Sequence, residues 1–378
     1  MKPFLILLAS SISLGIHAQA AVDRDARISE LHATYTAFQE AVATLDKSLS
    51  ETLGHTALKL SERLYGADHL DTAKLTYQVA YAMRPGGKAL YKPFDFDPAG
   101  LELAELAVRR YTTAFGLEDD EIVAPIILVI KFLASGLNHN AFGESHKQRK
   151  NQLEILIAHA EDIAKASDDP ELSPDFYQNI SKLGLNSSKR YAEKAARLFD
   201  TAYGPKHPRT LIARMSAAAF KKGTSQAKVY ERILADAEGV EEFNEYRFAL
   251  HQKLSISYLQ LGSEAKATRH LQAAGRLTIT TGDSEYRPLF KIAPVYPRRA
   301  AARGIQGYVL LEFTVTSEGA VRNPKVLESR PRGIFERAAM KAAQQYRYLP
   351  QYVNGEPVEV QGVSQFMKFE LLEWTKKN

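Results

Sequence analysis

Apolar residues recur at helical spacing through roughly the first three quarters of the chain. From about residue 27 to residue 273 they return every three or four positions, which places them on one face of successive amphipathic helices. The first such stripe contains Leu31, Tyr35, Phe38, Val42, Leu45 and Leu49. This pattern predicts that residues 21–277 form an all-α region.

Three of the helical segments, at 58–83, 106–133 and 195–220, share one outline. Each contains an apolar helix that ends in an aromatic residue followed by glycine, then a short polar loop and a second apolar helix. Glycine commonly ends a helix by adopting a left-handed backbone, so each segment predicts two antiparallel helices. The three aromatic–glycine pairs are Tyr65-Gly66, Phe115-Gly116 and Tyr203-Gly204. Weaker pairs are predicted at 153–163 with 176–185 and at 229–237 with 246–261, before a final helix at 265–276.

These segments resemble the longer kind of tetratricopeptide repeat, in which the first helix ends in Tyr-Gly. The resemblance rests on residues 65–69 and 203–208. It implies a helical solenoid with a concave groove, and an irregular helical bundle without a groove is the alternative. His69 and His207 occupy equivalent loop positions, and we expect them to cap or pack against the helices rather than to bind a ligand.

The pattern changes to strict alternation after residue 307. Residues 308–316 are expected to form a strand with Val309, Leu311, Phe313 and Val315 on its buried face. A glycine turn and a second strand at 321–329 follow, and Pro324 requires that strand to lie at an edge or to bulge. A helix is expected at 333–346, with Phe335, Ala339, Ala342 and Tyr346 as its buried stripe.

The last strand is expected at 358–371, and its pattern requires an interruption. Val358 and Val360 have even positions, whereas the apolar residues from Val363 onward have odd positions. A bulge at Gly362 would bring both groups to one face. The whole chain is therefore predicted to be α+β, with helices at 21–277, a linker at 278–286 and a small β-β-α-β module at 287–378.

The composition narrows the chemistry that is available. The 378 residues include no Cys, which excludes disulfides, thiolate catalysis and Cys-ligated metals. The formal net charge is +5, and from Arg287 onward there are 15 Lys and Arg against 8 Asp and Glu. That excess favours an acidic partner, an anionic lipid or cell-wall polymer, or nucleic acid, and a contribution to solubility explains it equally well.

The first 20 residues have the composition of a signal peptide. Lys2 precedes an apolar run from Phe4 to Ile16, and Ala18-Gln19-Ala20 matches a cleavage site. The run is shorter than the about 20 residues that a membrane span needs. We therefore expect an exported, periplasmic protein that begins at Ala21.

The C-terminal module resembles the C-terminal domain of the TonB family of energy transducers. The positions that carry the resemblance are Pro294-x-Tyr296-Pro297, Gly304-x-x-Gly307, Ser317-Glu318-Gly319, Phe335-x-x-Ala338-Ala339, Tyr346-x-Tyr348-x-Pro350, Gly355-x-Pro357-Val358 and Met367-x-Phe369. They occur in order over about 85 residues. Tyr346 stands where the family commonly has Trp.

The resemblance implies that the module binds the TonB box, a short peptide of outer-membrane receptors, by strand addition beside its third strand. It implies a partner-binding set made of the arm, the entry to the first strand and the third strand: Tyr296, Pro297, Gln306, Gly307, Tyr308, Val360, Val363, Gln365 and Met367. For Tyr296, packing against the sheet is an equal alternative.

Family transducers also carry an N-terminal membrane anchor with a Ser-x-x-x-His pair, and a Pro-rich spacer. Ser13 and His17 have this spacing, but a cleaved signal peptide would remove both. Coupling to the inner-membrane motor, or to another TonB-system protein, would then go through the helical repeats. Nucleic acid is not an expected partner.

No catalytic motif is found in the sequence, and we expect neither an enzyme nor a cofactor. One local group, His139, Glu144, His146 and His159, is rich in histidine. Its spacing fits no standard metal site, so exposed polar residues are expected there. Two functions therefore remain: an accessory of TonB-dependent transport, and a periplasmic scaffold for envelope assembly that uses the same modules without energy transduction.

Overall fold

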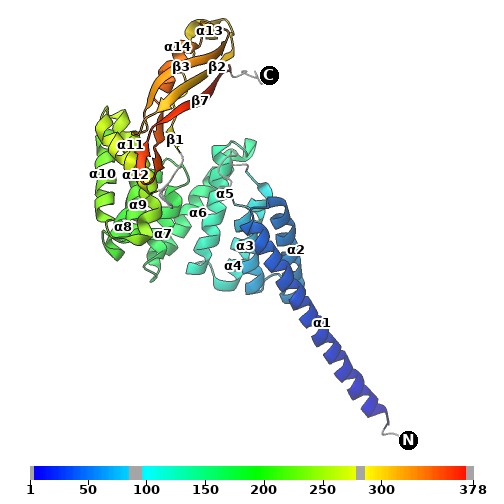
Figure 1. Ribbon diagram of the computed structural model, residues 1–378. Helices are drawn as coiled ribbons and strands as arrows, with labels where there is room; N and C mark the ends of the chain where they lie inside the picture. Colours follow the sequence, from blue (N-terminus) through cyan, green and yellow to red (C-terminus); the bar gives the residue numbers. More distant parts are fainter. Residues whose placement is uncertain (1–3, 85–95, 278–285, 372–378) are drawn as a thin grey trace. The chain divides into compact units, whose positions relative to one another are not determined.

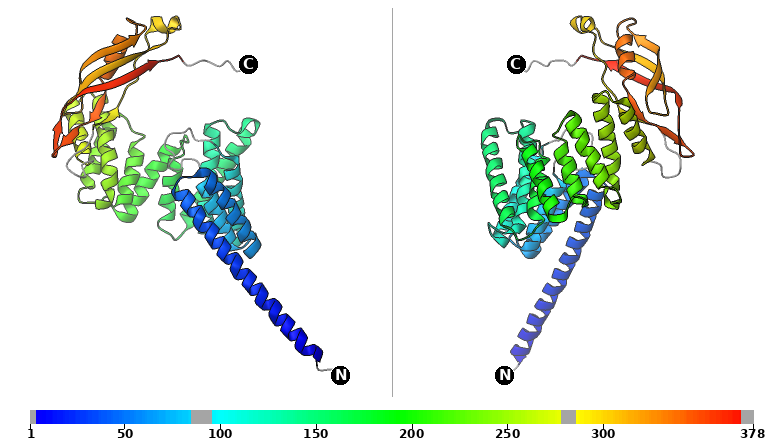
Figure 2. Two further views of the ribbon diagram at one scale, coloured as in Figure 1. Left: turned by 45° about the vertical axis from the view of Figure 1, so that its right-hand side comes forward. Right: turned by 90° about the vertical axis from the view of Figure 1, so that its left-hand side faces the viewer.

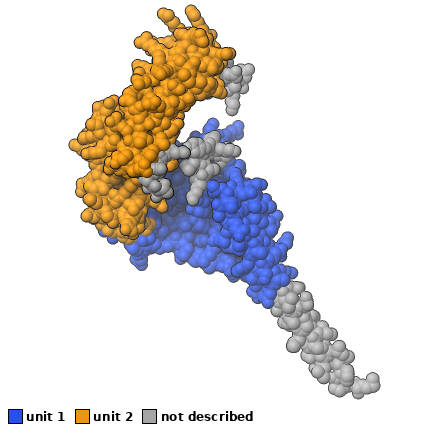
Figure 3. All heavy atoms as spheres, in the orientation of Figure 1, with its two compact units in different colours: residues 1–202 blue, residues 203–378 orange. Residues whose placement is uncertain are grey.

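The computed structural model describes residues 4–84, 96–277 and 286–371, with side chains from Arg24 onward (Figure 1). The chain divides into two compact units, Met1–Ala202 and Tyr203–Asn378 (Figure 3). The division falls within the helical part of the sequence, so the second unit combines helices with the C-terminal strands. The predicted domain boundaries at 20, 277 and 286 stay predictions.

The first unit is built from helices that pack on their neighbours in the chain (Figure 1). They are α1 (Phe4–Ala43), α2 (Lys47–Tyr65), α3 (Leu70–Ala82), α4 (Pro98–Phe115), α5 (Val123–Asn138), α6 (His146–Ala166), α7 (Leu172–Ser181) and α8 (Ser188–Tyr203), with 3₁₀ turns η1 (Asp120–Ile122) and η2 (Gly143–Ser145). Helix α5 is the most apolar of these and is buried along most of its length. The expected all-α region is confirmed.

Glycines follow α2 and α4, and histidines precede α3 and α9, as the sequence predicts, but the predicted left-handed backbone is wrong for Gly66 and Gly116. Gly66 and Gly116 follow α2 and α4 with φ of 99° and 101°. Their ψ angles of 158° and 172° place them in the extended region that only glycine visits freely, rather than in the left-handed helical region. The Nδ1 atoms of His69 and His207 accept the backbone N–H of the residue two positions later, at 3.2 and 3.3 Å. The predicted capping role is confirmed.

No single helix within the described residues is both long and apolar enough to cross a membrane. One sharply bent pair, Asp120–Asn138 with Gly143–Ala166, passes on length and composition alone. The structure does not describe the side chains of the predicted signal peptide.

The second unit begins with helices and ends with strands (Figure 2). Its helices are α9 (Pro208–Ala218), α10 (Gly223–Asp236), η3 (Glu241–Phe243), α11 (Asn244–Gln260), α12 (Glu264–Arg276), α13 (Arg298–Ala302) and α14 (Glu336–Ala343). Helices α11 and α12 form a hairpin through a turn in which Gly262 has a φ of 71°.

A three-stranded antiparallel sheet forms the centre of the C-terminal module. Its order is β3 (Val321–Arg330), β2 (Gly307–Val315) and β7 (Val360–Phe369). The alternating apolar residues of β2 are buried against α14, together with the predicted stripe of Phe335, Ala339, Ala342 and Tyr346. The predicted β-β-α-β order is confirmed, although α14 ends at Ala343, three residues before the expected end.

Both irregularities that the sequence predicts are present. The β2–β7 register shifts between Phe313 and Val315, where β7 has one residue more than β2. Gly362 lies at this bulge with a φ of 69°. Strand β3 lies at the edge of the sheet, and its register shifts around Pro324. Apolar parity thus located the irregularity at Gly362, and the missing N–H of proline located the one at Pro324. A second register shift of β3, opposite Leu310 and Leu311, was not predicted.

Four short strands were not predicted. Strands β1 (Arg287–Phe290) and β4 (Arg347–Leu349) pair with each other, and β5 (Gln351–Val353) pairs with β6 (Glu356–Val358). The β5–β6 hairpin packs against α12: the ring of Tyr352 is fully buried, and its hydroxyl donates to the carbonyl of Gln272 at 3.0 Å. Leu271 and Ala274 of α12 bury Leu349 beside it. The C-terminal module is thus packed directly on the last helix of the repeats.

Candidate functional site

The long strand β7 lies at an edge of the main sheet. It pairs with β2 from Phe369 opposite Gly307 to Val363 opposite Phe313, without interruption. On its other side no strand follows among the residues that the structure describes. A regular, seven-residue edge of this kind presents free backbone N–H and C=O groups to an extended peptide.

Side chains on β7 alternate between the core and the outer face of the sheet. Val363, Met367 and Phe369 are buried in the core against α14. Ser364, Phe366 and Lys368 point to the opposite face and are exposed. The side chains of two residues of the predicted site, Val363 and Met367, therefore face the core and are not presented at this edge. Val360 lies half-buried at the start of the strand, before the bulge.

The segment that precedes α13 runs beside β7. The ammonium of Lys291 donates to Oε1 of Gln365 at 2.5 Å. Partial removal of this ammonium from water lowers the pKa of Lys291. Tyr296 lies near the end of the strand, where its ring meets the rings of Phe335 and Phe369 edge-on and its hydroxyl donates to the carbonyl of Ile305 at 2.7 Å. Tyr296 therefore packs against the sheet, and Pro297 precedes α13 as its cap residue.

The three predicted residues at the entry to β2 have different environments. Gln306 accepts the backbone N–H of Leu371 at 3.1 Å and so closes the end of β7. Gly307 begins β2 with no room for a side chain, because a Cβ would lie 1.9 Å from the carbonyl oxygen of Arg330. The hydroxyl of Tyr308 donates to Glu328 at 2.5 Å across the outer face, and this hydrogen bond raises the pKa of Tyr308.

Phe366 is the residue of this edge that sequence reasoning missed. Its side chain is 48% exposed, and its ring lies 5.1 Å from that of Tyr308 on the neighbouring strand. The two aromatic rings form an apolar strip on the face away from α14. Even positions in β7 alternate with the buried odd positions, so the signal was present once the bulge at Gly362 fixed the parity.

The opposite edge of the sheet is less suited to pairing. Strand β3 has two register shifts with β2, and Pro324 removes one N–H from it. Arg322 and Lys325 are exposed along this edge, and Arg322 forms an ion pair with Glu359. Charges, proline and bulges are the features by which proteins keep an edge strand unpaired, so β7 is the better of the two edges for a peptide.

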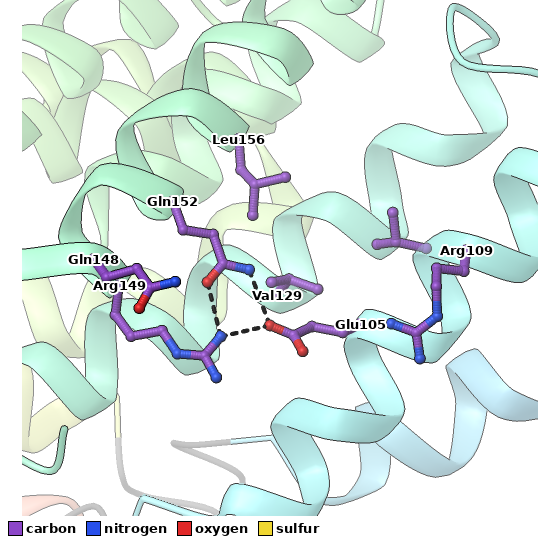
Figure 4. Close-up of a pocket in the computed structure, with 8 residues that line it drawn as sticks. Glu105, Arg109, Val129, Gln148, Arg149, Gln152 and Leu156 are labelled. Atoms are coloured by element: carbon purple, nitrogen blue, oxygen red, sulfur yellow. Dashed lines mark hydrogen bonds and ion pairs between the residues drawn. The ribbon is translucent and has the colours of Figure 1, made fainter. Parts of the chain in front are cut away.

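In the first unit α4, α5 and α6 line an open cavity of about 470 Å³ (Figure 4). Figure 4 shows Arg149, Gln152 and Glu105 turned toward one another there. Arg149 donates to Glu105 at 2.9 Å and to Gln152 at 2.8 Å, and Gln152 donates to Glu105 at 2.9 Å. Because this half-buried carboxylate and guanidinium neutralise each other, they leave no uncompensated charge that would indicate a charged ligand here.

The His-rich group separates into individual contacts. His159 bonds the carbonyl of Leu117 at 3.0 Å, and His139 bonds the carbonyl of Ser135 at 2.8 Å. Within the described ranges no three His, Asp or Glu side chains come together in a way that could hold a metal ion.

Comparison with known proteins identifies the C-terminal module. Residues 292–371 match the family model described as Gram-negative bacterial TonB protein C-terminal. Protein TonB of Pseudomonas aeruginosa is 40% identical over 93 residues, which are 25% of this chain and 27% of that protein. Protein TonB of Escherichia coli is 38% identical over 78 residues, 21% of this chain and 33% of that protein. The chain thus spans about a third or less of these relatives.

Two solved structures match the same region. The solution structure of the Pseudomonas aeruginosa TonB C-terminal domain is 36% identical, covers 25% of this chain and 93% of that one, and gives a TM-score of 0.22. A TonB2 protein from Vibrio anguillarum is 34% identical, covers 25% of this chain and 86% of that one, with a TM-score of 0.20. From the family match and the identities to the curated relatives, we conclude that residues 292–371 are a member of the Gram-negative bacterial TonB protein C-terminal family.

Proposed function

We propose that the β7 edge binds an extended segment of an outer-membrane receptor by strand addition, and that the chain serves TonB-dependent transport across the outer membrane. One observation carries the proposal: β7 is paired on one side only, in unbroken register from Val363 to Phe369. Main-chain hydrogen bonds would provide affinity, and alternate side chains would provide selectivity.

Three features of the edge define the peptide that would fit. Phe366 and Tyr308 offer apolar contact to outward side chains of the added strand. Lys368 is exposed on the same face and favours an acidic group near that end of the peptide. Gln365 and Lys291 together present an amide and an ammonium on the other face. A peptide with alternating apolar and polar residues and an acidic group is therefore expected to bind.

Binding to the full-length chain is to be measured by titration calorimetry with a peptide copied from the TonB box of such a receptor. Micromolar affinity is expected. Methylating alternate backbone nitrogens of the peptide removes its N–H donors on one side only, because successive N–H groups of a strand point to opposite sides. One methylated series should lose at least tenfold in affinity, and the other should keep it. Equal behaviour of the two series would contradict strand addition.

The matched protein variants are Ser364→Pro and Gln365→Pro. One of these two neighbouring N–H groups points to β2 and the other to the open edge. The proline at the edge-facing position should abolish peptide binding while the unfolding midpoint changes little, and the other should destabilise the sheet. Phe366→Ala tests the side-chain contribution separately, with an expected loss of several-fold. Full affinity in all three variants would rule out this edge as the peptide site.

We further propose that the chain is exported and cleaved after Ala20, which would place both units in the periplasm. The Ala18-Gln19-Ala20 sequence supports this. Mass spectrometry of the mature N-terminus is the test: a chain that begins at Ala21 supports the proposal, and a chain that retains Ser13 and His17 contradicts it.

A further inference from the structure

A second cavity, of about 420 Å³, lies along the hairpin of α11 and α12. Among the residues that the structure describes, its lining contains three arginines and a histidine but no Asp or Glu; these lining residues are Arg247, His251, Arg269, Gln272, Ala273, Arg276 and Leu277. In this respect it differs from the cavity of the first unit, where Glu105 neutralises Arg149. The positive charges on its wall thus have no compensating carboxylate within the described part of the lining.

The partners of the three arginines leave most of this charge available. Arg247 donates to Oδ1 of Asn244 at 2.9 Å and to the carbonyl of Ala237, both neutral acceptors. Arg269 has a carboxylate oxygen of Glu231 at 4.0 Å, and its side chain is 69% exposed. The same oxygen of Glu231 also accepts the hydroxyl of Tyr258 at 2.5 Å. Arg276 is exposed, and its guanidinium interacts with the hydroxyl of Tyr352, a neutral group.

Helix geometry gives the spacing of these groups. Arg269 and Arg276 are seven residues apart, so they lie on one face of α12, about 10 Å apart along its axis. Arg247 and His251 are four residues apart on one face of α11. In the hairpin, Nδ1 of His251 meets Nδ1 of His270 at 3.0 Å, which places His251 beside the stretch between Arg269 and Arg276.

His251 supplies a neutral polar group among these charges. Burial and the neighbouring Arg247 lower the pKa of His251. His270 behind it is 5% exposed, and burial lowers its pKa to about 4. Near neutral pH the pair is therefore uncharged, and the arginines provide the positive potential of the cavity.

We propose that this cavity binds a ligand that carries at least two phosphate groups, with Arg247, Arg269 and Arg276 as its charge partners. Guanidinium groups match the tetrahedral oxyanion through paired N–H donors. The backbone positions of Arg269 and Arg276 are about 10 Å apart along α12, and two linked phosphate groups can engage both guanidinium groups at this spacing. The apolar Ala273 and Leu277 on the same wall leave space for the carbon skeleton between the phosphates.

The position of the cavity links it to the C-terminal module. Gln272 lines the cavity, and its backbone carbonyl accepts the hydroxyl of Tyr352 from the β5–β6 hairpin. Arg276 follows one turn later, next to Gly275, against which the Tyr352 ring packs. A ligand here would therefore bind beside the contact between α12 and the sheet module, and independently of the β7 edge.

The test is calorimetry on the full-length chain with inorganic tripolyphosphate, at constant ionic strength and with sulfate as the comparison anion. We expect saturable binding of tripolyphosphate in the micromolar range and at least tenfold weaker binding of sulfate. Arg269→Gln and Arg276→Gln should each reduce affinity about tenfold, and Arg276→Lys should lie between wild type and Gln. The control is Arg337→Gln, an exposed arginine of α14 outside the cavity, and its affinity should stay within twofold. Thermal unfolding must show that each variant keeps its midpoint.

Three results would overturn the proposal: no saturable binding at millimolar tripolyphosphate, an equal loss in Arg337→Gln, or tighter binding of an acidic octapeptide than of tripolyphosphate. A second measurement, with lipid vesicles, distinguishes a lipid headgroup from a free phosphorylated ligand. Sedimentation with phosphatidylcholine vesicles that contain a bisphosphorylated lipid, but not with phosphatidylcholine alone, would assign a lipid headgroup. Tripolyphosphate binding without vesicle binding would assign a free phosphorylated ligand.

Discussion

The backbones of β2 and β3 approach each other closely at Gly307, at the entry to the candidate peptide site. A Cβ at this position would lie 1.9 Å from the carbonyl oxygen of Arg330 and 2.9 Å from the ring of Phe335. Neither a backbone carbonyl in a sheet nor a buried ring can move aside easily. The requirement for glycine here is therefore one of space.

Gly307→Ala should consequently destabilise the C-terminal module by about 2 to 3 kcal/mol, the typical cost of overpacking. Urea unfolding followed by circular dichroism measures this. Gly304→Ala is the control: Gly304 has a φ of 64° but nothing within 4 Å of an added Cβ, so only backbone strain of about 1 kcal/mol is expected. A smaller cost at Gly307 than at Gly304 would show that the strands separate readily.

His270 gives a pH-dependent contribution to stability. Its pKa in the folded protein is lowered to about 4 from 6.5, chiefly by burial and then by His251 and Arg269. The unfolded chain therefore binds a proton between pH 6.5 and 4 that the folded chain excludes. This contribution is fully present above pH 6.5 and is lost as the pH falls toward 4, with a size of up to about 3 kcal/mol.

His270→Phe removes this titration and keeps a ring beside Tyr258, with which His270 stacks at 5.7 Å. The free energy of unfolding is to be measured for wild type and variant at pH 7 and pH 4.5. Carboxylates titrate in both proteins, so the difference between them reports His270 together with its coupling to His251. Wild type should lose more stability than the variant on acidification, and an equal loss would disprove the assignment.

At the scale of the elements, the short β5–β6 hairpin is central to the packing of the sheet module on α12. Tyr352 at its centre is 1% exposed, packs on Gly275 and bonds the carbonyl of Gln272. Arg347 of β4 lies 3.6 Å from Glu264 at the start of α12. These contacts fix the sheet module to α12.

Tyr352→Ala should cost about 3 to 5 kcal/mol, as for other buried aromatic residues, and Tyr352→Phe only about 1 kcal/mol for the lost hydrogen bond. Hydrogen exchange resolves where the loss occurs: protection should fall in both α12 and the β5–β6 hairpin. Loss confined to the hairpin would mean that α12 is stable without this contact.

The elements that were predictable from sequence are those with a long, regular pattern. The alternation of apolar and polar residues in β2 predicted its buried face. In β7 the apolar residues change from even to odd positions around Gly362, and this change predicted the bulge that determines which β7 side chains point outward. Strands β1, β4, β5 and β6 have only three or four residues, too few to establish a period, so they escaped prediction. The packing of Tyr352 on α12 joins residues 80 apart, and no local pattern encodes it.

The candidate site, too, was predictable from sequence only in part. The resemblance to the TonB family pointed to β7 and to the entry of β2, but it assigned no direction to the side chains. Val363 and Met367 proved to be buried, whereas Phe366 was overlooked and is exposed. The contacts of Gln306 and Lys291 depend on residues 65 and 74 positions away, so they appear only in the folded chain.

At the scale of the whole molecule, the second compact unit joins α9–α12 to the sheet module. A fragment of residues 287–378 would lack Leu271, Ala274 and Gly275, the surfaces that bury Leu349 and Tyr352. Its sheet, however, retains all of β2, β3 and β7. Stability and peptide binding should therefore respond differently to removal of the helices.

We expect the C-terminal module to unfold at a lower urea concentration in the 287–378 fragment than in a 203–378 fragment, with a difference of about 2 to 4 kcal/mol from the exposed Leu349 and Tyr352. Under native conditions, both fragments should bind the receptor peptide with affinities within about threefold, because β7 pairs with β2 and the packing on α12 involves β4 and β5. Urea titration and calorimetry on the two fragments measure the two quantities separately. Equal stability would show that the contact with α12 contributes little. Loss of peptide binding from a fragment shown to be folded would mean that the helices form part of the receptor site.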